Sequence, residues 1–347
     1  MRRITLSAGQ FLGGIVAVLV AFAALMFPAR CQAQFPPGWF EDVRPVPGLN
    51  SPWQDQSPFV TDGGLTIYFT SDRPNGGTTR VEHDVWMAAR TNTSEAFGMP
   101  VNVGVPINSA AAETGLYLSN GGTTLYMASR RPGTAGRSDI WLFERDNTSD
   151  VWGNPVSVGP EINTAESEFG PWLSSDGLTL YFSRRQGDDR STEDIFRATR
   201  NSLADDFSNP EKLANSHSHV LESQVSMSSN DLTMFFQRQS SPSSPFEIWV
   251  ASRSSTSEEF TAQYNINQFV KASSINSSSY YTFTPYISPD WPAVGSKLYF
   301  GLATSSNDWD LFEATWVPEP SSVCMSFVAV FGLLGSVRMQ LGRRLRH

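Results

Sequence analysis

The stretch GPWLSSDGLTLYFSRRQGDDRSTEDIFRATR, residues 170–200, predicts three consecutive β-strands. Residues 171–174 form a short apolar run, and Asp176-Gly177 is a dipeptide typical of a hairpin turn. Residues 178–183 alternate in polarity and are rich in aromatic and aliphatic side chains, which favours a strand. A polar loop over 184–193 then leads into the third strand at 194–199.

This three-strand pattern occurs five times in the chain, at intervals of about 53 to 63 residues. The second strand recurs at 66–69, 124–127, 179–182, 233–236 and 297–300. The third strand begins with a carboxylate, an aliphatic and an aromatic residue, at 84–86, 139–141, 194–196, 247–249 and 310–312. A fourth strand follows Phe97 and Trp152 and, in weaker form, Phe207 and Phe260. Four-stranded units at this period are typical of the blades of a β-propeller.

The phase of the repeat predicts how the ring closes. If the strand of the 171–174 type is innermost in each unit, the strand around Val156 is of the outermost type. The last unit has no outermost strand, whereas Trp39–Gly48 is a spare one at the N-terminus. We therefore expect residues 43–47 to pair with 311–316, because closure satisfies backbone groups that an open edge would expose. The predicted fold is an all-β, five-bladed propeller of four-stranded antiparallel blades, flanked by N- and C-terminal hydrophobic targeting helices.

Over about residues 40–316 the repeat resembles the WD40-like repeat of TolB-type propeller proteins. That pattern is Pro-x-hydrophobic-Ser-Pro-Asp-Gly, a Tyr-Phe strand, Ser-x-Arg, and Asp-Ile followed by Tyr or Trp. It is matched in part by Ser288-Pro289-Asp290, by Ser71-Asp72-Arg73 and by Asp139-Ile140-Trp141. The fourth copy departs at Asn230-Asp231 and the fifth carries an insertion at 291–296. The resemblance implies a fold and no single activity, because propellers host many functions.

Composition narrows the class of protein further. The 347 residues include 10 Trp, 23 Phe and 9 Tyr, enough aromatic side chains to fill the spaces between blades. The net charge of −9 argues against nucleic acid as a partner, because phosphate binding needs a basic surface. Cys31 and Cys324 both lie outside the repeats, so the predicted propeller has neither a disulfide nor a thiolate metal site.

The N-terminal segment, residues 1–33, resembles a secretory signal peptide. Arg2 and Arg3 precede an apolar run at 11–27, and Cys31-Gln32-Ala33 offers a cleavage site with small residues. The alternative is an uncleaved membrane anchor. On the first interpretation the mature protein begins near residue 34, and the propeller domain extends over residues 34–316.

The C-terminal segment, residues 317–347, has three parts: Pro318-Glu319-Pro320, an apolar run at 323–337, and a basic end. The basic end contains Arg338, Arg343, Arg344 and Arg346. This arrangement resembles the PEP-CTERM sorting signal of Gram-negative bacteria. The resemblance implies export across the inner membrane, a precursor held transiently in the membrane by its targeting helices, and cleavage by an exosortase-type processing enzyme. The product would then reside at the cell surface or outside the cell; the alternative is a permanent C-terminal anchor.

Four carboxylates precede the innermost strands at matching positions, and Thr282 takes this place in the fifth unit. They are Asp55, Glu113, Glu168 and Glu222. We expect them to cluster at one mouth of the central channel, where carboxylate oxygens could bind Ca²⁺ or raise one another's pKa. The alternative is that each caps a turn or pairs with an Arg of a neighbouring blade. Repetition favours this alternative, because scaffold roles repeat and catalytic roles rarely do.

The acidic residue that begins each of the five third strands is expected to stabilise the fold rather than to bind a ligand. An Arg six residues after the acidic residue, as in Arg90, Arg145, Arg200 and Arg253, is interpreted as its partner or flank. The sequence has no nucleophile elbow, phosphate loop or dinucleotide fingerprint, and so predicts no catalytic residue.

These features favour a secreted, surface-sorted propeller that acts as a binding or scaffold module for extracellular polysaccharide or envelope proteins. The alternative is a glycoside hydrolase of the five-bladed furanosidase type. Two of Glu113, Glu168 and Glu222 would then act as acid and base, at a separation of about 5 to 9.5 Å. A third hypothesis is a structural domain stabilised by Ca²⁺.

Overall fold

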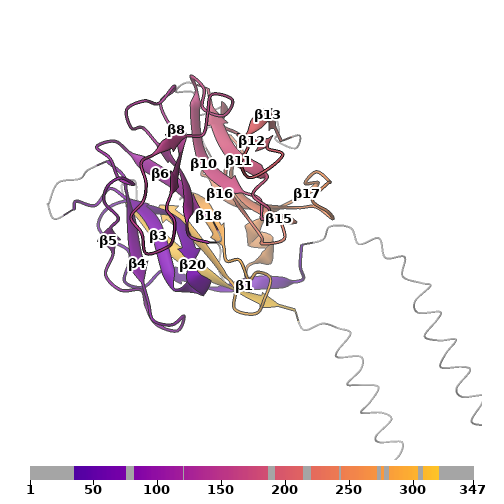
Figure 1. The fold of residues 1–347 in the computed structure, drawn as a ribbon. Coiled ribbons are helices and arrows are strands. Elements are labelled where there is room, and N and C mark those ends of the chain that lie inside the picture. Colours follow the sequence, from indigo (N-terminus) through magenta and orange to yellow (C-terminus); the bar gives the residue numbers. More distant parts are fainter. Residues whose placement is uncertain are drawn as a thin grey trace, which may run out of the picture.

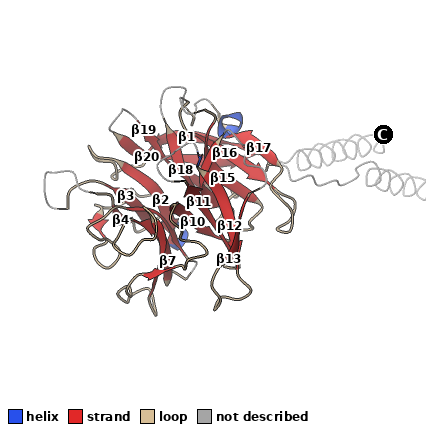
Figure 2. Ribbon diagram, turned by 90° about the horizontal axis from the view of Figure 1, so that it is seen from above, coloured by secondary structure: helices blue, strands red, loops and turns tan. Residues whose placement is uncertain are grey.

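The computed structural model describes residues 35–75, 82–119, 121–186, 192–213, 220–241, 244–271, 275–276, 281–303 and 308–319. In this part of the chain, strands β1 to β20 form five antiparallel sheets of four strands each. The sheets are arranged around a common centre (Figures 1 and 2), which confirms the five-bladed propeller. Blades 1 to 4 each run from the innermost to the outermost strand in chain order.

The strand bounds follow the predicted repeat closely. Blade 1 consists of β2 (Asp55–Thr61), β3 (Thr66–Ser71), β4 (Asp84–Ala89) and β5 (Val101–Asn102), with the 3₁₀ turn η1 (Asp62–Gly64) between β2 and β3. Blade 2 consists of β6 (Glu113–Leu118), β7 (Thr124–Ser129), β8 (Asp139–Glu144) and β9 (Val156–Ser157). Blade 3 consists of β10 (Ser167–Leu173), β11 (Thr179–Arg185), β12 (Asp194–Thr199) and β13 (Ser208–Lys212).

The last two blades differ in how their outer strand is supplied. Blade 4 consists of β14 (Leu221–Met227), β15 (Thr233–Gln239), β16 (Glu247–Ser252) and β17 (Ala262–Asn265), followed by the 3₁₀ helix η3 (Ile266–Phe269). Blade 5 consists of β18 (Thr282–Ile287), β19 (Lys297–Ala303), β20 (Trp309–Pro318) and β1 (Gly38–Pro45). The N-terminal strand is therefore the outermost strand of the last blade.

Closure takes place by antiparallel pairing of β1 with β20. The register joins Phe40 to Trp316 and Pro45 to Phe312, with a bulge between Glu41 and Arg44. Beyond the strand, the N–H of Val46 donates to the carbonyl oxygen of Leu311 at 2.8 Å. The predicted closure is confirmed, and the strand begins five residues earlier than expected, at Gly38.

Aromatic packing holds the closing strand in place. The Phe40 side chain is fully buried and its ring lies 4.9 Å from that of Trp316 and 6.4 Å from that of Phe235. Phe35 stacks on Phe269 at 4.0 Å. Since burying one Phe stabilises a fold by about 1.5 to 3 kcal/mol, these contacts hold β1, the outermost strand of blade 5, against blade 4.

Each innermost strand contains a bulge at the same position. The bulged residue has a positive φ in all five blades: Ser57, Gly115, Gly170, Gln224 and Thr284. This conformation directs the N–H of Gln224 to the hydroxyl of Ser183, and that of Thr284 to the amide oxygen of Gln237, both in the preceding blade. A non-glycine residue in this region costs on the order of 1 kcal/mol, which the bonds between blades help to offset.

A second backbone contact joins successive blades at the start of the innermost strand. The N–H groups of Glu113, Glu168, Glu222 and Thr282 donate to carbonyl oxygens of the preceding blade at 2.8 to 3.2 Å. The acceptors are His83, Ser138, Glu193 and Phe246, each next to the first residue of a third strand. These bonds tie the blades together at one face of the ring, which we call the strand-start face.

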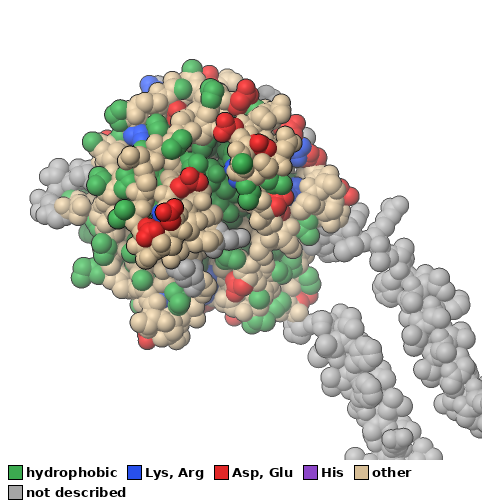
Figure 3. All heavy atoms as spheres, in the orientation of Figure 1, with side chains coloured by type: hydrophobic (Ala, Val, Ile, Leu, Met, Phe, Trp, Pro, Cys, Tyr) green, Lys and Arg blue, Asp and Glu red, His purple; other side chains and the backbone are tan. Residues whose placement is uncertain are grey.

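Residues 1–33, and 320–347 of the C-terminal segment, lie outside the described residues, and the expected targeting helices lie there with them. Within the described residues, none of the helices has the length and apolar character that a membrane span requires. On the face shown in Figure 3, Asp and Glu side chains are spread over the surface and few Lys or Arg side chains are visible, in keeping with the net charge of −9.

Candidate functional site

The four candidate carboxylates lie on the strand-start face and are buried. Asp55, Glu113 and Glu168 are fully buried, and Glu222 is 3% exposed. Each forms an ion pair with an Arg at or just after the end of the second strand of its own blade. These pairs are Asp55 with Arg73 at 2.5 Å, Glu113 with Arg131 at 3.3 Å, Glu168 with Arg184 at 2.8 Å, and Glu222 with Arg238.

Three of these carboxylates also close a turn. The backbone N–H and hydroxyl of Ser51 donate to Asp55 at 2.7 and 2.9 Å. Ser109 donates to Glu113, and Thr164 to Glu168, in the same way four residues upstream. The alternative interpretation of the sequence, a turn cap paired with an Arg, thus describes these side chains, although the Arg belongs to the same blade rather than a neighbouring one.

The electrostatics follow from this burial. Burial raises the pKa of Asp55 above its ordinary value, and the attraction of Arg73 opposes that shift. Burial likewise raises the pKa of Glu113, against hydrogen bonds from Ser109. The Arg side chains are themselves covered by aromatic rings, as where Arg238 lies 4.3 Å from the ring centre of Trp249.

The carboxylates therefore form four separate ion pairs rather than one shared acidic cluster. None of the four lines the central cavity, and no group of three or more His, Cys, Asp or Glu side chains among the described residues is arranged to hold a metal ion. The expectation that these residues jointly bind Ca²⁺ gains no support from this geometry.

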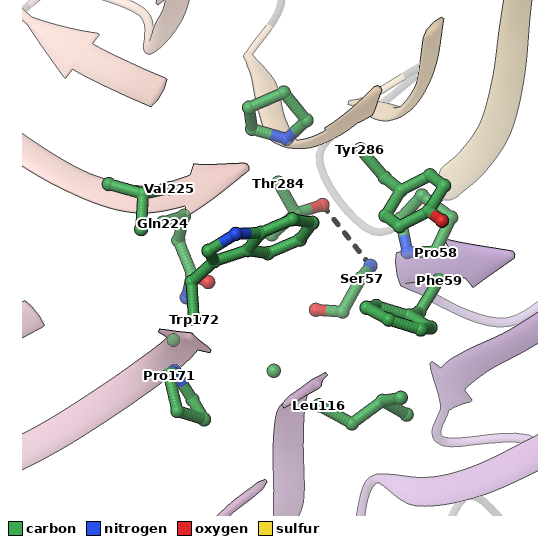
Figure 4. A pocket seen from close by; sticks show the side chains of 13 residues that line it. Ser57, Pro58, Phe59, Leu116, Pro171, Trp172, Gln224, Val225, Thr284 and Tyr286 are labelled. Carbon is green, nitrogen blue, oxygen red and sulfur yellow. Dashed lines mark hydrogen bonds between the residues drawn. The ribbon is translucent and has the colours of Figure 1, made fainter. Parts of the chain in front are cut away.

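The central cavity lies among the bulged segments of all five innermost strands (Figure 4). Its volume of about 30 Å³ holds roughly two water molecules and is too small for a sugar ring. The lining contains polar groups of Ser57, Gln224 and Thr284, but no Asp or Glu side chain among the described residues. Acid–base chemistry by a pair of carboxylates therefore has no place in this cavity.

Aromatic rings pack around the channel beside the bulges. Phe59, Tyr117, Trp172 and Tyr286 occupy equivalent positions in four blades, and Ser226 occupies the fifth. Neighbouring rings in this group lie 4.8 to 6.0 Å apart. The Tyr286 hydroxyl donates to the carbonyl oxygen of Val60, and this hydrogen bond joins blade 5 to blade 1.

The Arg residues that follow the third strands bind turns. The Nε groups of Arg90, Arg145, Arg200 and Arg253 donate to the carbonyl oxygens of Gly64, Gly122, Gly177 and Asp231, in the hairpin turns of their own blades. Each guanidinium also lies 4.2 to 4.5 Å from the ring that heads the fourth strand. The acidic series expected as their partner binds other groups, for example the amide of Asn102 at Asp84 and Lys212 at Asp194.

Blade 5 departs from the other blades on the strand-start face. Burial and the neighbouring charges of Asp308 and Asp55 raise the pKa of Asp310 to about 6. The sequence analysis did not single out four aromatic side chains near the starts of β16, β18 and β20. They form two contacting pairs, Phe246 with Tyr281 and Phe283 with Trp309. A break in the repeat could have revealed them. The position just before the third strand holds His83, Ser138 and Glu193 in blades 1 to 3, but Phe246 and Trp309 in blades 4 and 5.

The predicted sorting motif lies partly within the structure. Pro318 is the last residue of β20 and pairs with Gly38, and the N–H of Glu319 donates to the carbonyl oxygen of Pro37 at 3.0 Å. Pro320, Arg343, Arg344 and Arg346 lie outside the described residues.

Comparison with solved structures finds propellers of glycoside hydrolases. The catalytic domain of a Coprinopsis cinerea GH62 α-L-arabinofuranosidase aligns with a TM-score of 0.53 and 10% identity, over 81% of this chain and 98% of that domain. A thermostable family-43 glycoside hydrolase aligns with a TM-score of 0.51 and 11% identity, over 79% of this chain and 92% of that one. No protein-family model and no curated protein sequence matches the chain. At such low identity the likeness establishes the fold alone.

Removal of one partner from a buried ion pair should be costly. We expect Glu168→Ala and Arg184→Ala each to lower the free energy of unfolding by about 3 to 5 kcal/mol, because each leaves a buried charge unpaired. The double variant should lose less than the sum of the two. The control, Glu211→Ala, breaks the exposed pair with Arg197 and should cost about 0.2 to 1 kcal/mol. Urea unfolding measures the stability of all four variants. Equal losses at the buried pair and at the exposed pair would contradict the assignment of Glu168 and Arg184 to a buried ion pair.

The carboxyl group of Asp310 should make stability depend on pH. Its pKa in the folded protein, about 6, lies above the ordinary value of 3.8, so folding favours the protonated form. This contribution is fully present below pH 3.8 and is lost as the pH rises through 6. We expect Asp310→Asn to raise the Tm at pH 7.5 and to change it little at pH 4. Calorimetry at several pH values checks this, and a pH-independent difference would contradict it.

Proposed function

We propose that the protein is a glycoside hydrolase of the propeller type that acts on a glycan outside the cell. The observation that supports this proposal best is the correspondence of its five blades with nearly the whole catalytic domain of an α-L-arabinofuranosidase. A second glycoside hydrolase aligns over a similar share of the chain. The comparisons favour this function over the binding or scaffold module that the sequence suggested.

The proposed chemistry requires two carboxyl groups, one of them protonated near neutral pH. Glu113, Glu168 and Glu222 do not suit this task, because each is buried and paired with an Arg. Asp310 suits it better, since its pKa is raised to about 6 and it is only partly buried. We therefore assign the general acid to Asp310, at the joint between blades 5 and 1, with Asp308 beside it.

A binding module without catalytic activity is the second candidate. It is favoured by the small central cavity, whose described lining residues include no carboxylate, and by the ion pairs that occupy all four of the expected acids. Its ligand would be an extracellular polysaccharide or an envelope component. The two candidates differ in one measurable property, the release of sugar from the bound glycan.

The test is hydrolysis of a panel of soluble arabinan, xylan and other polysaccharides by the purified protein. We expect release of reducing sugar from at least one of them, and a loss of about 100-fold or more with Asp310→Asn, as for removal of a general acid. Glu168→Gln serves as the control, with activity retained as long as the variant stays folded. If the native protein binds a polysaccharide but releases no sugar from it, the hydrolase proposal is wrong and the binding module remains.

We also propose that residues 1–33 direct export and that an exosortase-type enzyme cleaves near Pro318-Glu319-Pro320. The order of the proline motif, the apolar run and the arginine-rich end supports this proposal. Mass spectrometry of the protein recovered from cells should find an N-terminus near residue 34 and no peptide containing Arg343, Arg344 or Arg346. Recovery of those peptides in the mature protein would rule out cleavage.

A further inference from the structure

The turn between the first two strands of blade 5 is longer than its counterparts in the other blades. Strand β18 ends at Ile287 and β19 begins at Lys297, which leaves nine residues, 288–296, that we call the blade 5 turn. The same turn has four or five residues in each of blades 1 to 4. Features that serve every blade alike recur in every blade, so an insertion in one of them indicates a role of its own.

The blade 5 turn is anchored to the ring by an aromatic side chain and by the backbone. Trp291 is 4% exposed, and its ring centre lies 5.3 to 5.6 Å from those of Phe35, Phe235 and Trp316. The N–H of Gly295 donates to the carbonyl oxygen of Trp316 at 3.0 Å. The turn therefore has a fixed position beside the end of β20.

The tip of the blade 5 turn is apolar and exposed. Pro292 and Ala293 are exposed, and Val294 is 79% exposed. The carboxylate of Asp290 accepts a hydrogen bond from the hydroxyl of Ser288 at the base of the turn. A single exposed apolar residue is common on protein surfaces, so exposure alone does not identify a partner. The location of this tip is more informative.

Both ends of the described ring lie beside this turn. Gly38 at the start of β1 pairs with Pro318 at the end of β20, so these strand ends lie side by side (Figure 1). The N–H of Glu319 donates to the carbonyl oxygen of Pro37 at 3.0 Å. The start of β1, the end of β20 and the blade 5 turn are thus neighbours on the face of the ring opposite to the strand-start face.

The chain leads from this place into an apolar run within a few residues. Only residues 320–322 separate Glu319 from the apolar run at 323–337. Even a fully extended chain covers no more than about 14 Å between Glu319 and Val323. Whenever the apolar run lies in a membrane, this end of blade 5 is therefore held close to the membrane surface.

The other side chains at this end of blade 5 suit a membrane surface. Trp39 follows Gly38 and pairs with Val317, and the Nζ of Lys271 lies 4.7 Å from the centre of its ring. Trp is enriched where membranes meet water, because its ring is largely apolar and carries one polar group. The exposed amine of Lys271 can attract anionic headgroups.

We propose that the tip of the blade 5 turn enters the surface of the membrane that holds residues 323–337, with Trp39 and Lys271 at the level of the headgroups. The inference rests on the proposed export, and it applies to the chain before cleavage near Pro318-Glu319-Pro320. It also orients the candidate acid, since Asp310 precedes Pro318 by eight residues, about 26 Å along β20. The strand-start face is turned away from the membrane and toward a glycan.

The test uses the full purified chain in vesicles of phosphatidylethanolamine and phosphatidylglycerol, with a spin label on some acyl chains. An environment-sensitive fluorophore is attached at Val294→Cys, after Cys31→Ala and Cys324→Ala remove the native thiols. Because an interfacial apolar residue lies about 5 to 10 Å into the membrane boundary, the spin label should remove about half of the emission or more. The control, Val105→Cys, should keep its emission, since Val105 is 85% exposed and follows β5 at the strand-start face.

A second variant tests whether the apolar tip is responsible. Ala293→Asp, combined with the label at residue 294, should restore most of the emission, because a carboxylate resists entry into lipid. These positions are exposed, so the substitutions leave the packing of the ring intact.

Three results would each overturn the inference: no quenching at residue 294, equal quenching at residues 294 and 105, or failure of the chain to float with the vesicles. The vesicles contain no other protein, so quenching reports contact with lipid rather than with a processing enzyme. Release of sugar is measured separately on the purified protein. The hydrolase proposal can therefore fail while the membrane contact holds, and the membrane contact can fail while hydrolysis is observed.

Discussion

The pairing of β1 with β20 is the constraint on which the rest of the structure depends. It converts a row of five sheets into a ring in which every blade has a neighbour on both sides, so no innermost strand is left with an open flank. The pairing is reinforced by the contact of Arg44 with Glu313 at 2.8 Å, between residues 269 positions apart in the chain. It also supports β20 from the outside, and the start of β20 carries Trp309 and Asp310.

The residues that recur from blade to blade have a different role from those that depart from the repeat. The carboxylate–arginine pairs recur because each joins strand ends and an aromatic ring within one blade, and three of the four also close a turn. Such buried pairs gain little net free energy, since desolvation offsets the attraction, but they fix the orientation of the groups around them. Blade 5 has no such pair, because Thr282 replaces the carboxylate, and at this blade aromatic rings occupy the corresponding region of the face.

Most of the fold could be predicted from the sequence because strand patterns and turn signals are local. The spacing of the second and third strands gave the number of blades, and the unmatched strand at the N-terminus gave the closure.

The candidate site was harder to predict. Spacing placed Asp55, Glu113, Glu168 and Glu222 correctly at the starts of innermost strands, but it could not reveal which Arg would reach them. Arg73 and Arg131 lie two residues beyond the strand end, whereas Arg184 and Arg238 lie within the strand, so the partner has no constant offset. The two aromatic pairs near the starts of β16, β18 and β20 were missed for a similar reason, since each pair joins residues from separate segments.

The order in which the chain is made has a consequence for the closing strand. Residues 38–45 are synthesised among the first of the described residues, but their partner β20 ends at Pro318, more than 270 residues later. At about 5 to 20 residues per second, roughly 15 to 55 seconds pass between the synthesis of Phe40 and that of its strand partner Trp316. During that interval the ring cannot close, because β20 has not been made. Contacts between residues this far apart in sequence are also slow to form once both partners exist. The nascent chain therefore has a long period of exposure to aggregation, which ends only when its last blade is complete.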